Sequence, residues 1–258
     1  MIILVKRIRI SIYIKNEQFK QMTMKTITLV SILFFSLVLT LNAQERSAVD
    51  LRSNLGLYSG DLLNFYNEVA QNKKMEKFDI TSVEGSPYLN NEFIKGELVT
   101  IDSVQYAGIP LRYNIYNDVI EFKKNDLELE LNNNFQLLYA IIDDAVFVKA
   151  KNQEGYFTVQ SSGPVYLLEK MNIRYSDAKA ASGYRPATLP SFKNLDSDYY
   201  IQKKLGEEAT VVKNEAELLE QLSDKKEELK VFIKNEKLKV SRGEDLVEII
   251  EYYNSLVN

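Results

Sequence analysis

From residue 97 onward, hydrophobic and polar positions alternate along the chain, and turn residues recur every eight to ten positions. A period of two is typical of strands with one buried face. In the segment 109–116, one side carries Leu111, Tyr113 and Ile115, and the other carries Arg112, Asn114 and Tyr116. Because the turns between such segments hold only two or three residues, neighbouring strands must be antiparallel. We expect a meander of eight or nine strands, curled into an open barrel or folded as a sandwich.

Helical periodicity flanks this region on both sides. Before it, apolar residues from Leu62 to Val69 recur with the spacing of an amphipathic helix over 59–73. After it, three amphipathic stretches begin at capping residues, namely Asn214, then Ser223 or Asp224, and Ser241. The pattern predicts an α+β protein that is mainly β, an antiparallel β-meander with an N-terminal helix and a C-terminal three-helix subdomain. The expected boundaries are 44–78 for the leader and helix, 79–213 for the β domain and 214–258 for the helical subdomain.

Two stretches of the β domain depart from simple alternation. The run 135–142 is apolar on both faces, so we expect its strand to lie deepest in the fold. Residues 177–195 lose all periodicity and gather alanine, serine and glycine with Pro186 and Pro190, which predicts a long surface loop or junction.

The N-terminal region has the pattern of an export signal. Residues 27–41 form an uncharged apolar run after Lys25, and Asn42-Ala43-Gln44 follows it. The run is shorter than the roughly 20 apolar residues of a membrane anchor, which is the alternative interpretation. We expect a secretory signal peptide over 1–43 with cleavage after Ala43, so that no transmembrane span remains. Residues 1–23 precede Met24 and represent an extended N-terminus or an incorrectly assigned start.

The composition of the chain excludes several classes of catalytic site, metal site and cross-link. The chain contains 0 His, 0 Cys and 0 Trp, which excludes Ser-His-Asp and Cys-His catalysis, zinc fingers and disulfides. The formal charge of the full chain is −4, but residues 1–43 hold six of the basic residues and one acid. The exported form therefore carries 26 basic and 35 acidic residues, a net charge of −9. An acidic chain without a basic run is a poor ligand for nucleic acid or anionic lipid.

The acidic residues predict neither a catalytic nor a metal site. The Asp-rich segment 194–198 has the opening spacing of a calcium loop, but Tyr199 and Leu205 occupy the positions of the required glycine and glutamate. Asp102, the Asp143-Asp144 pair and the Glu128/Glu130 pair lie near strand ends. Glu128 and Glu130 alternate with leucines, so we expect both on a solvated face, without the raised pKa of a general acid. We predict no catalytic residue, no cofactor and no metal.

Arg112, Asn114 and Tyr116 form the candidate interaction surface. They share the polar face of one predicted strand, and arginine and tyrosine are enriched at binding hot spots. Pairing of Arg112 with an acidic residue on the neighbouring strand is the alternative, and it produces the same sequence pattern.

Two motifs carry a resemblance to a known group. The segments 85–90 (GSPYLN) and 109–122 (IPLRYNIYNDVIEF), together with the lysine-rich tail 225–254, are similar to uncharacterised exported proteins of Bacteroidetes type. The resemblance implies export and a β region followed by helices, and it implies no activity.

These patterns favour an exported, non-catalytic binding or scaffold protein of the cell envelope with an envelope protein as partner. The Sec pathway would deliver it to the periplasm or cell surface of a Gram-negative bacterium, and its oligomeric state stays open. One alternative is a carrier whose barrel encloses an apolar ligand between Leu111, Tyr113, Phe122 and Leu129. The other is a secreted hydrolase that uses two carboxylates.

Overall fold

The computed structural model describes residues 57–69 and 83–257 of the chain. The predicted signal peptide over 1–43 and the leader residues 44–56 lie outside the described residues. A two-residue strand, β1 (Tyr58–Ser59), precedes helix α2 (Leu62–Glu68). The predicted extension of this helix to residue 73 also lies outside the described residues.

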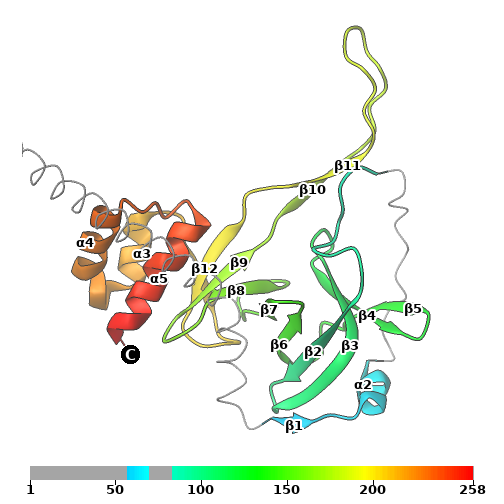
Figure 1. The fold of residues 1–258 in the computed structure, drawn as a ribbon, viewed down its shortest axis with the longest axis horizontal. Helices are drawn as coiled ribbons and strands as arrows, with labels where there is room; N and C mark the ends of the chain where they lie inside the picture. The colour runs from blue at the N-terminus through cyan, green and yellow to red at the C-terminus, as the bar shows by residue number, and fades with distance from the viewer. Residues whose placement is uncertain (1–56, 70–82, 258) are drawn as a thin grey trace, which may run out of the picture. The chain divides into compact units, whose positions relative to one another are not determined.

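Eleven strands form one large sheet (Figure 1). Besides β1, its strands are β2 (Ile94–Thr100), β3 (Val104–Asn114), β4 (Val119–Lys124), β5 (Leu127–Glu130), β6 (Leu137–Ile142), β7 (Ala145–Val148), β8 (Phe157–Ser161), β9 (Tyr166–Lys170), β12 (Asp198–Gln202) and β13 (Ala209–Val211). Their order is β13-β12-β9-β8-β7-β6-β2-β3-β4-β5, and β1 pairs with β3 in parallel. All other pairs in this sheet are antiparallel, so the prediction of a mainly β protein with an antiparallel meander is confirmed.

The meander runs in two parts that meet at β2. Strands β2 to β5 follow one another, and then β6 returns to pair with the free side of β2. The short connections contain Asp118, Asn125 and Asp143, each with a positive φ between 54° and 57°. Aspartate and asparagine tolerate this left-handed conformation, which tight turns require. The sheet is not closed into a barrel.

Hydrophobic residues pack on both faces of the sheet. Ala140 and Ile142 on β6 join one cluster, while Ile141 between them joins the cluster on the opposite face. Strand β6 is therefore buried on both sides, as the run 135–142 predicted. The four side chains expected to line a ligand cavity, Leu111, Tyr113, Phe122 and Leu129, all belong to the first cluster. There they pack with Phe65 of α2, whose ring centroid lies 5.4 Å from that of Phe122.

The C-terminal region is helical, as predicted. It consists of α3 (Glu215–Gln221), a 3-10 turn η2 (Ser223–Lys225), α4 (Lys226–Glu236) and α5 (Gly243–Val257). Asn214 caps α3, because its Oδ1 accepts a 3.0 Å hydrogen bond from the Glu217 N–H. Buried residues of these helices pack against Leu167 of β9 and Ile201 of β12. Among the described residues, no helix combines the length and apolar character needed to cross a membrane.

The prediction of a long surface loop or junction over 177–195 is right about the exposure of 177–189 but misses the pairing of the segment. Strands β10 (Ile173–Ser176) and β11 (Ser191–Asn194) pair antiparallel, and isolated bridges Lys179–Thr188 and Ser182–Arg185 continue the same register toward the turn. The segment is thus a β-hairpin. Its outer part is exposed on both faces, so it has no buried side that would impose an alternating pattern.

Candidate functional site

The hairpin of residues 173–194, which we name the arm, is the most exposed structured segment among the described residues (Figure 1). Every residue from 177 to 189 is exposed. At about 3.3 Å per residue, the seven positions from 177 to the turn at 183 span about 23 Å. An isolated two-stranded hairpin is marginally stable in water, and this one has no third strand among the described residues.

The tip of the arm is a tight two-residue turn. The backbone groups of Ser182 and Arg185 exchange two hydrogen bonds of 3.0 Å, and Gly183 and Tyr184 form the loop between them. Gly183 has a φ of +56°, as the first position of a type II′ turn requires. Tyr184 at the second position is fully exposed, and Leu189 farther back is 59% exposed. The turn therefore presents a tyrosine next to an arginine at the outermost point of the arm.

The arm is basic, whereas the protein is acidic. Its charged residues are Arg174, Lys179, Arg185 and Lys193 against Asp177, a net charge of +3. The other described residues, which we name the body, hold 17 basic and 30 acidic residues, a net charge of −13. None of the four basic side chains of the arm forms an ion pair with a described residue. The arm thus concentrates uncompensated positive charge.

Aromatic contacts hold the base of the arm. Tyr175 and Phe192 lie opposite each other on β10 and β11, with ring centroids 5.0 Å apart. Tyr116, just after β3, packs on both, with its centroid 5.2 Å from Phe192 and 6.2 Å from Tyr175. Aromatic pairs at such distances stabilise a contact beyond the area that they bury. These rings fix the point at which the arm leaves the rest of the chain.

A second support is the segment 84–93, which we name the clamp. The Glu84 N–H donates to the Pro190 carbonyl at 2.9 Å, and the Phe192 N–H donates to the Glu84 carbonyl at 2.8 Å. Gly85 has a φ of +80°, and a Cβ there would lie 2.5 Å from the Phe192 carbonyl oxygen. The clamp therefore pairs with the arm where only glycine fits.

Arg112 of β3 contacts the clamp through its guanidinium group. Its guanidinium carbon lies 3.7 Å from the ring centroid of Tyr88 and 4.2 Å from that of Phe93, both in the clamp. Its Nη1 donates to the Asn91 carbonyl at 3.1 Å. Its Nε and Nη2 both donate to Glu121 Oε2, at 2.9 Å and 2.5 Å. A planar guanidinium can stack and donate in its plane at once, so one side chain joins the sheet to the clamp.

The predicted interaction surface is thus divided by the structure. Arg112 is 7% exposed and Asn114 is 3% exposed, so the expectation of an accessible row is corrected for these two residues. Asn114 Nδ2 donates to Glu121 Oε1 at 2.8 Å, and Arg112 pairs across strands with Glu121, which is the alternative that the sequence left open. Tyr116 is 46% exposed, and it contacts the arm.

The face of Glu128 and Glu130 also differs from the expectation. Glu128 is partly buried, and its carboxylate lies 3.3 Å from Arg112 and 3.8 Å from Lys123. The face was expected to be solvated because polar residues alternate with leucines. Phe93 of the clamp lies against Arg112 and Lys123, the two cations near Glu128. Charged residues in such a mutually satisfied network can occupy a partly covered face.

Asp118 organises a further polar cluster. Its carboxylate accepts from the Tyr113 hydroxyl at 2.7 Å and from the Tyr156 N–H at 2.9 Å, and it pairs with Lys170 Nζ. Because Asp118 lies between β3 and β4 while Lys170 ends β9, the cluster joins strands that are far apart in the strand order of the sheet. Burial raises the pKa of Tyr113 well above its ordinary 10.0, and the Asp118 carboxylate raises it further.

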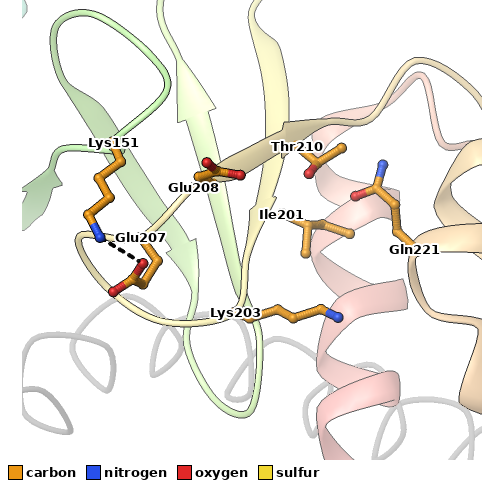
Figure 2. A pocket seen from close by; sticks show the side chains of 7 residues that line it. All are labelled: Lys151, Ile201, Lys203, Glu207, Glu208, Thr210 and Gln221. Atoms are coloured by element: carbon orange, nitrogen blue, oxygen red, sulfur yellow. Dashed lines mark hydrogen bonds and ion pairs between the residues drawn. The ribbon is translucent and has the colours of Figure 1, made fainter.

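A shallow cleft of about 420 Å³ lies between the β12–β13 turn and α3 (Figure 2). It is lined by Lys151, Ile201, Lys203, Glu207, Glu208, Thr210 and Gln221. The charged side chains balance, and Lys151 pairs with Glu207 at 3.1 Å while both are well exposed. Such a solvated pair contributes little binding energy, so the cleft offers weak recognition.

The hydrolase hypothesis requires a cleft carboxyl group with a raised pKa. Burial raises the pKa of Glu121 above its ordinary 4.5 although hydrogen bonds from Asn114 and Arg112 oppose the shift. Burial together with neighbouring carboxylates raises the pKa of Glu248. Neither residue lines the cleft. Within the described part of the chain, no group of three or more acidic residues could hold a metal ion, and this includes the segment 194–198.

The chain matches no family model, no curated protein and no solved structure. Sequence reasoning missed the arm because it read 177–195 as a loop, although Gly183 followed by Tyr184 in a segment between two apolar runs is compatible with a two-residue hairpin turn.

Proposed function

We propose that this protein is an exported, non-catalytic binding protein of the cell envelope and that it engages a partner macromolecule through the arm. The observation that carries the proposal is an exposed hairpin on a fixed base. Residues 177–189 are exposed, whereas Tyr175 and Phe192 at the base are held by Tyr116 and the clamp. An unpaired hairpin gains little stability alone, so a partner strand or surface would complete it.

The side chains at the tip suit recognition. Tyrosine and arginine are the residue types most enriched, with tryptophan, among binding hot spots. Tyr184 and Arg185 lie next to each other at the turn, and Leu189 adds exposed apolar area on the returning strand. Export is supported by the apolar run 27–41 and the Asn42-Ala43-Gln44 sequence that follows it.

The structure favours binding through the arm over the two alternatives, a carrier of an apolar ligand and a hydrolase. A carrier needs an enclosed cavity, but the four predicted cavity residues pack against one another and against α2 in a sheet that is not closed. A hydrolase needs a raised carboxyl pKa at a cleft, and Glu121 uses both oxygens to hold Arg112 and Asn114.

Site-specific photo-crosslinking in the exporting bacterium tests the proposal. A photoreactive amino acid at position 184 is expected to give discrete higher-mass adducts on illumination of intact cells. The matched control places the same amino acid at Val231, which is 59% exposed on α4 and lies outside the arm. Absence of adducts from position 184, or the same adducts from both positions, would contradict the proposal.

A further inference from the structure

The strongest unexplained feature of the described residues is the separation of charge between the arm and the body. The arm carries a net charge of +3 within 22 residues, and the body carries −13. Arg174 and Lys193 lie directly opposite each other across β10 and β11. Like charges in this position destabilise a hairpin unless a negative group lies near them. The geometry therefore calls for an acidic surface against the arm.

We propose that this acidic surface is the body of a second copy of the chain, which names the partner in the function proposed above and rests on it. Two arms repel each other and two bodies repel each other, but an arm attracts a body. Because each copy carries one arm and one acidic body, two copies can satisfy both arms by reciprocal docking, and closure gives a dimer.

The length of the arm makes this contact compatible with the repulsion between bodies. The exposed part spans about 23 Å, whereas the Debye length is about 8 Å at physiological ionic strength. An arm can therefore reach a second body while the two bodies stay separated by more than the distance over which their charges act. A flat patch with the same positive charge would bring the two acidic bodies into contact, so that they would repel each other.

The backbone of the arm favours the same contact. Beyond β10, the exposed continuation 177–182 pairs, within the described residues, only across the hairpin, through the bridges Lys179–Thr188 and Ser182–Arg185. The continuation 177–182 contains no proline, while the returning strand carries Pro186 and Pro190, which lack N–H donors. Its small side chains, Ala178, Ala180 and Ala181, allow another backbone to approach closely. Free strand edges of this kind add readily to other chains.

Sedimentation of the purified exported protein over a concentration series tests the proposal. At about 0.15 M salt, where the Debye length is about 8 Å, the weight-average mass is expected to rise with concentration above that of one chain. In about 1 M salt, where the Debye length is about 3 Å, it is expected to return to the mass of one chain. A single-chain mass at every concentration in about 0.15 M salt would overturn the proposal.

Two variants with the same net charge distinguish the effect of the positive charges on the arm from the effect of the net charge of the whole protein. The first reverses all charges that the proposal uses: Arg174→Glu, Lys179→Glu, Arg185→Glu and Lys193→Glu. The second makes the same four changes at exposed positions outside the arm: Lys204→Glu, Lys226→Glu, Lys234→Glu and Lys239→Glu. The first is expected to weaken self-association by about tenfold or more, and the second to retain it. Equal association of the two variants, with both folded by circular dichroism, would overturn the proposal.

The remaining outcome distinguishes this inference from the proposed function. If the protein stays monomeric but binds phosphatidylglycerol vesicles, and the arm variant loses that binding, the partner is an anionic lipid surface and the second copy is excluded. Crosslinks from position 184 would then still support arm-mediated binding. Failure of those crosslinks removes the proposed function itself.

Discussion

Arg112 shows how one residue links the sheet to the arm. Its guanidinium lies between the rings of Tyr88 and Phe93 and donates to Glu121, which is 0% exposed. The clamp that these rings anchor pairs in turn with Phe192 at the base of the arm. A buried ion pair stabilises a fold little compared with an apolar pair, but removal of one partner is costly because the other charge stays buried.

We expect Arg112→Met to lower the free energy of unfolding by about 3–5 kcal/mol, because it leaves the Glu121 carboxylate buried without its cation. The double variant Arg112→Met, Glu121→Leu is expected to lose less than the single variant. Urea unfolding of both proteins measures the difference. A loss by the single variant of less than about 1 kcal/mol, or additive losses, would show that the pair does not act as one unit.

Buried tyrosines predict how stability depends on alkaline pH. Burial is the main cause of the raised pKa of Tyr113 and Tyr156, and the Asp118 carboxylate adds to both. The folded chain therefore retains these phenolic protons above the ordinary pKa of 10.0, at which the unfolded chain loses them. Their contribution to stability is complete below pH 10.0 and falls as the pH rises above it.

We expect two classes of tyrosine in a titration followed by ultraviolet absorbance. Exposed tyrosines should ionise near the ordinary value, whereas Tyr113 and Tyr156 should ionise only with the loss of circular dichroism. Tyr113→Phe should flatten the alkaline loss of stability. Ionisation of all tyrosines in one step, while the protein remains folded, would contradict the burial of these two hydroxyls.

At the scale of elements, the alternating pattern predicted most of the fold. Strands β2 to β9 lie in the expected regions because each has at least one face that must be apolar. The clamp and the arm were not predicted, since neither has a periodic apolar face. The pattern also did not predict the burial of Arg112 and Asn114. Their strand has a polar face that a segment distant in sequence covers, and the sequence of the strand alone contains no sign of this cover.

The junction between clamp and arm gives a prediction at this scale. Gly85→Ala is expected to lower the free energy of unfolding by about 1–3 kcal/mol, because its Cβ would meet the Phe192 carbonyl at a positive φ. The control is Gly206→Ala, where φ is +77° but no atom lies within 4 Å of the added Cβ. Thermal unfolding of both variants separates two costs. Gly206→Ala measures the cost of a positive φ alone, and Gly85→Ala adds the steric clash with Phe192. Equal losses of unfolding free energy in the two variants would contradict the close contact between Gly85 of the clamp and Phe192 of the arm.

Among the described residues, packing holds the body of the molecule together, whereas contacts at its base hold the arm. The chain contains 0 Cys, so no disulfide supports either part. Removal of the predicted signal changes the formal charge from −4 to −9, and within the described residues the arm opposes that charge. The charge and the exposure of the arm favour it as the part through which the proposed binding occurs.

Export is the first test at this scale. The chain recovered from the periplasm or cell surface is expected to begin at Gln44, because the small residue Ala43 ends the predicted signal. N-terminal sequencing of that fraction measures the start directly. A chain that begins upstream of residue 27 would mean that the apolar run is retained, as in a membrane anchor.

Amide hydrogen exchange tests whether the arm is a marginally stable hairpin in the isolated chain and is stabilised by association. In dilute protein at high salt, amides of residues 177–189 are expected to exchange almost without protection, while those of β6 stay protected. At about 0.15 M salt and high concentration, the same arm amides are expected to gain protection, and α4 amides are not. Arm amides that are already protected in dilute protein, or that gain no protection on association, would contradict the account.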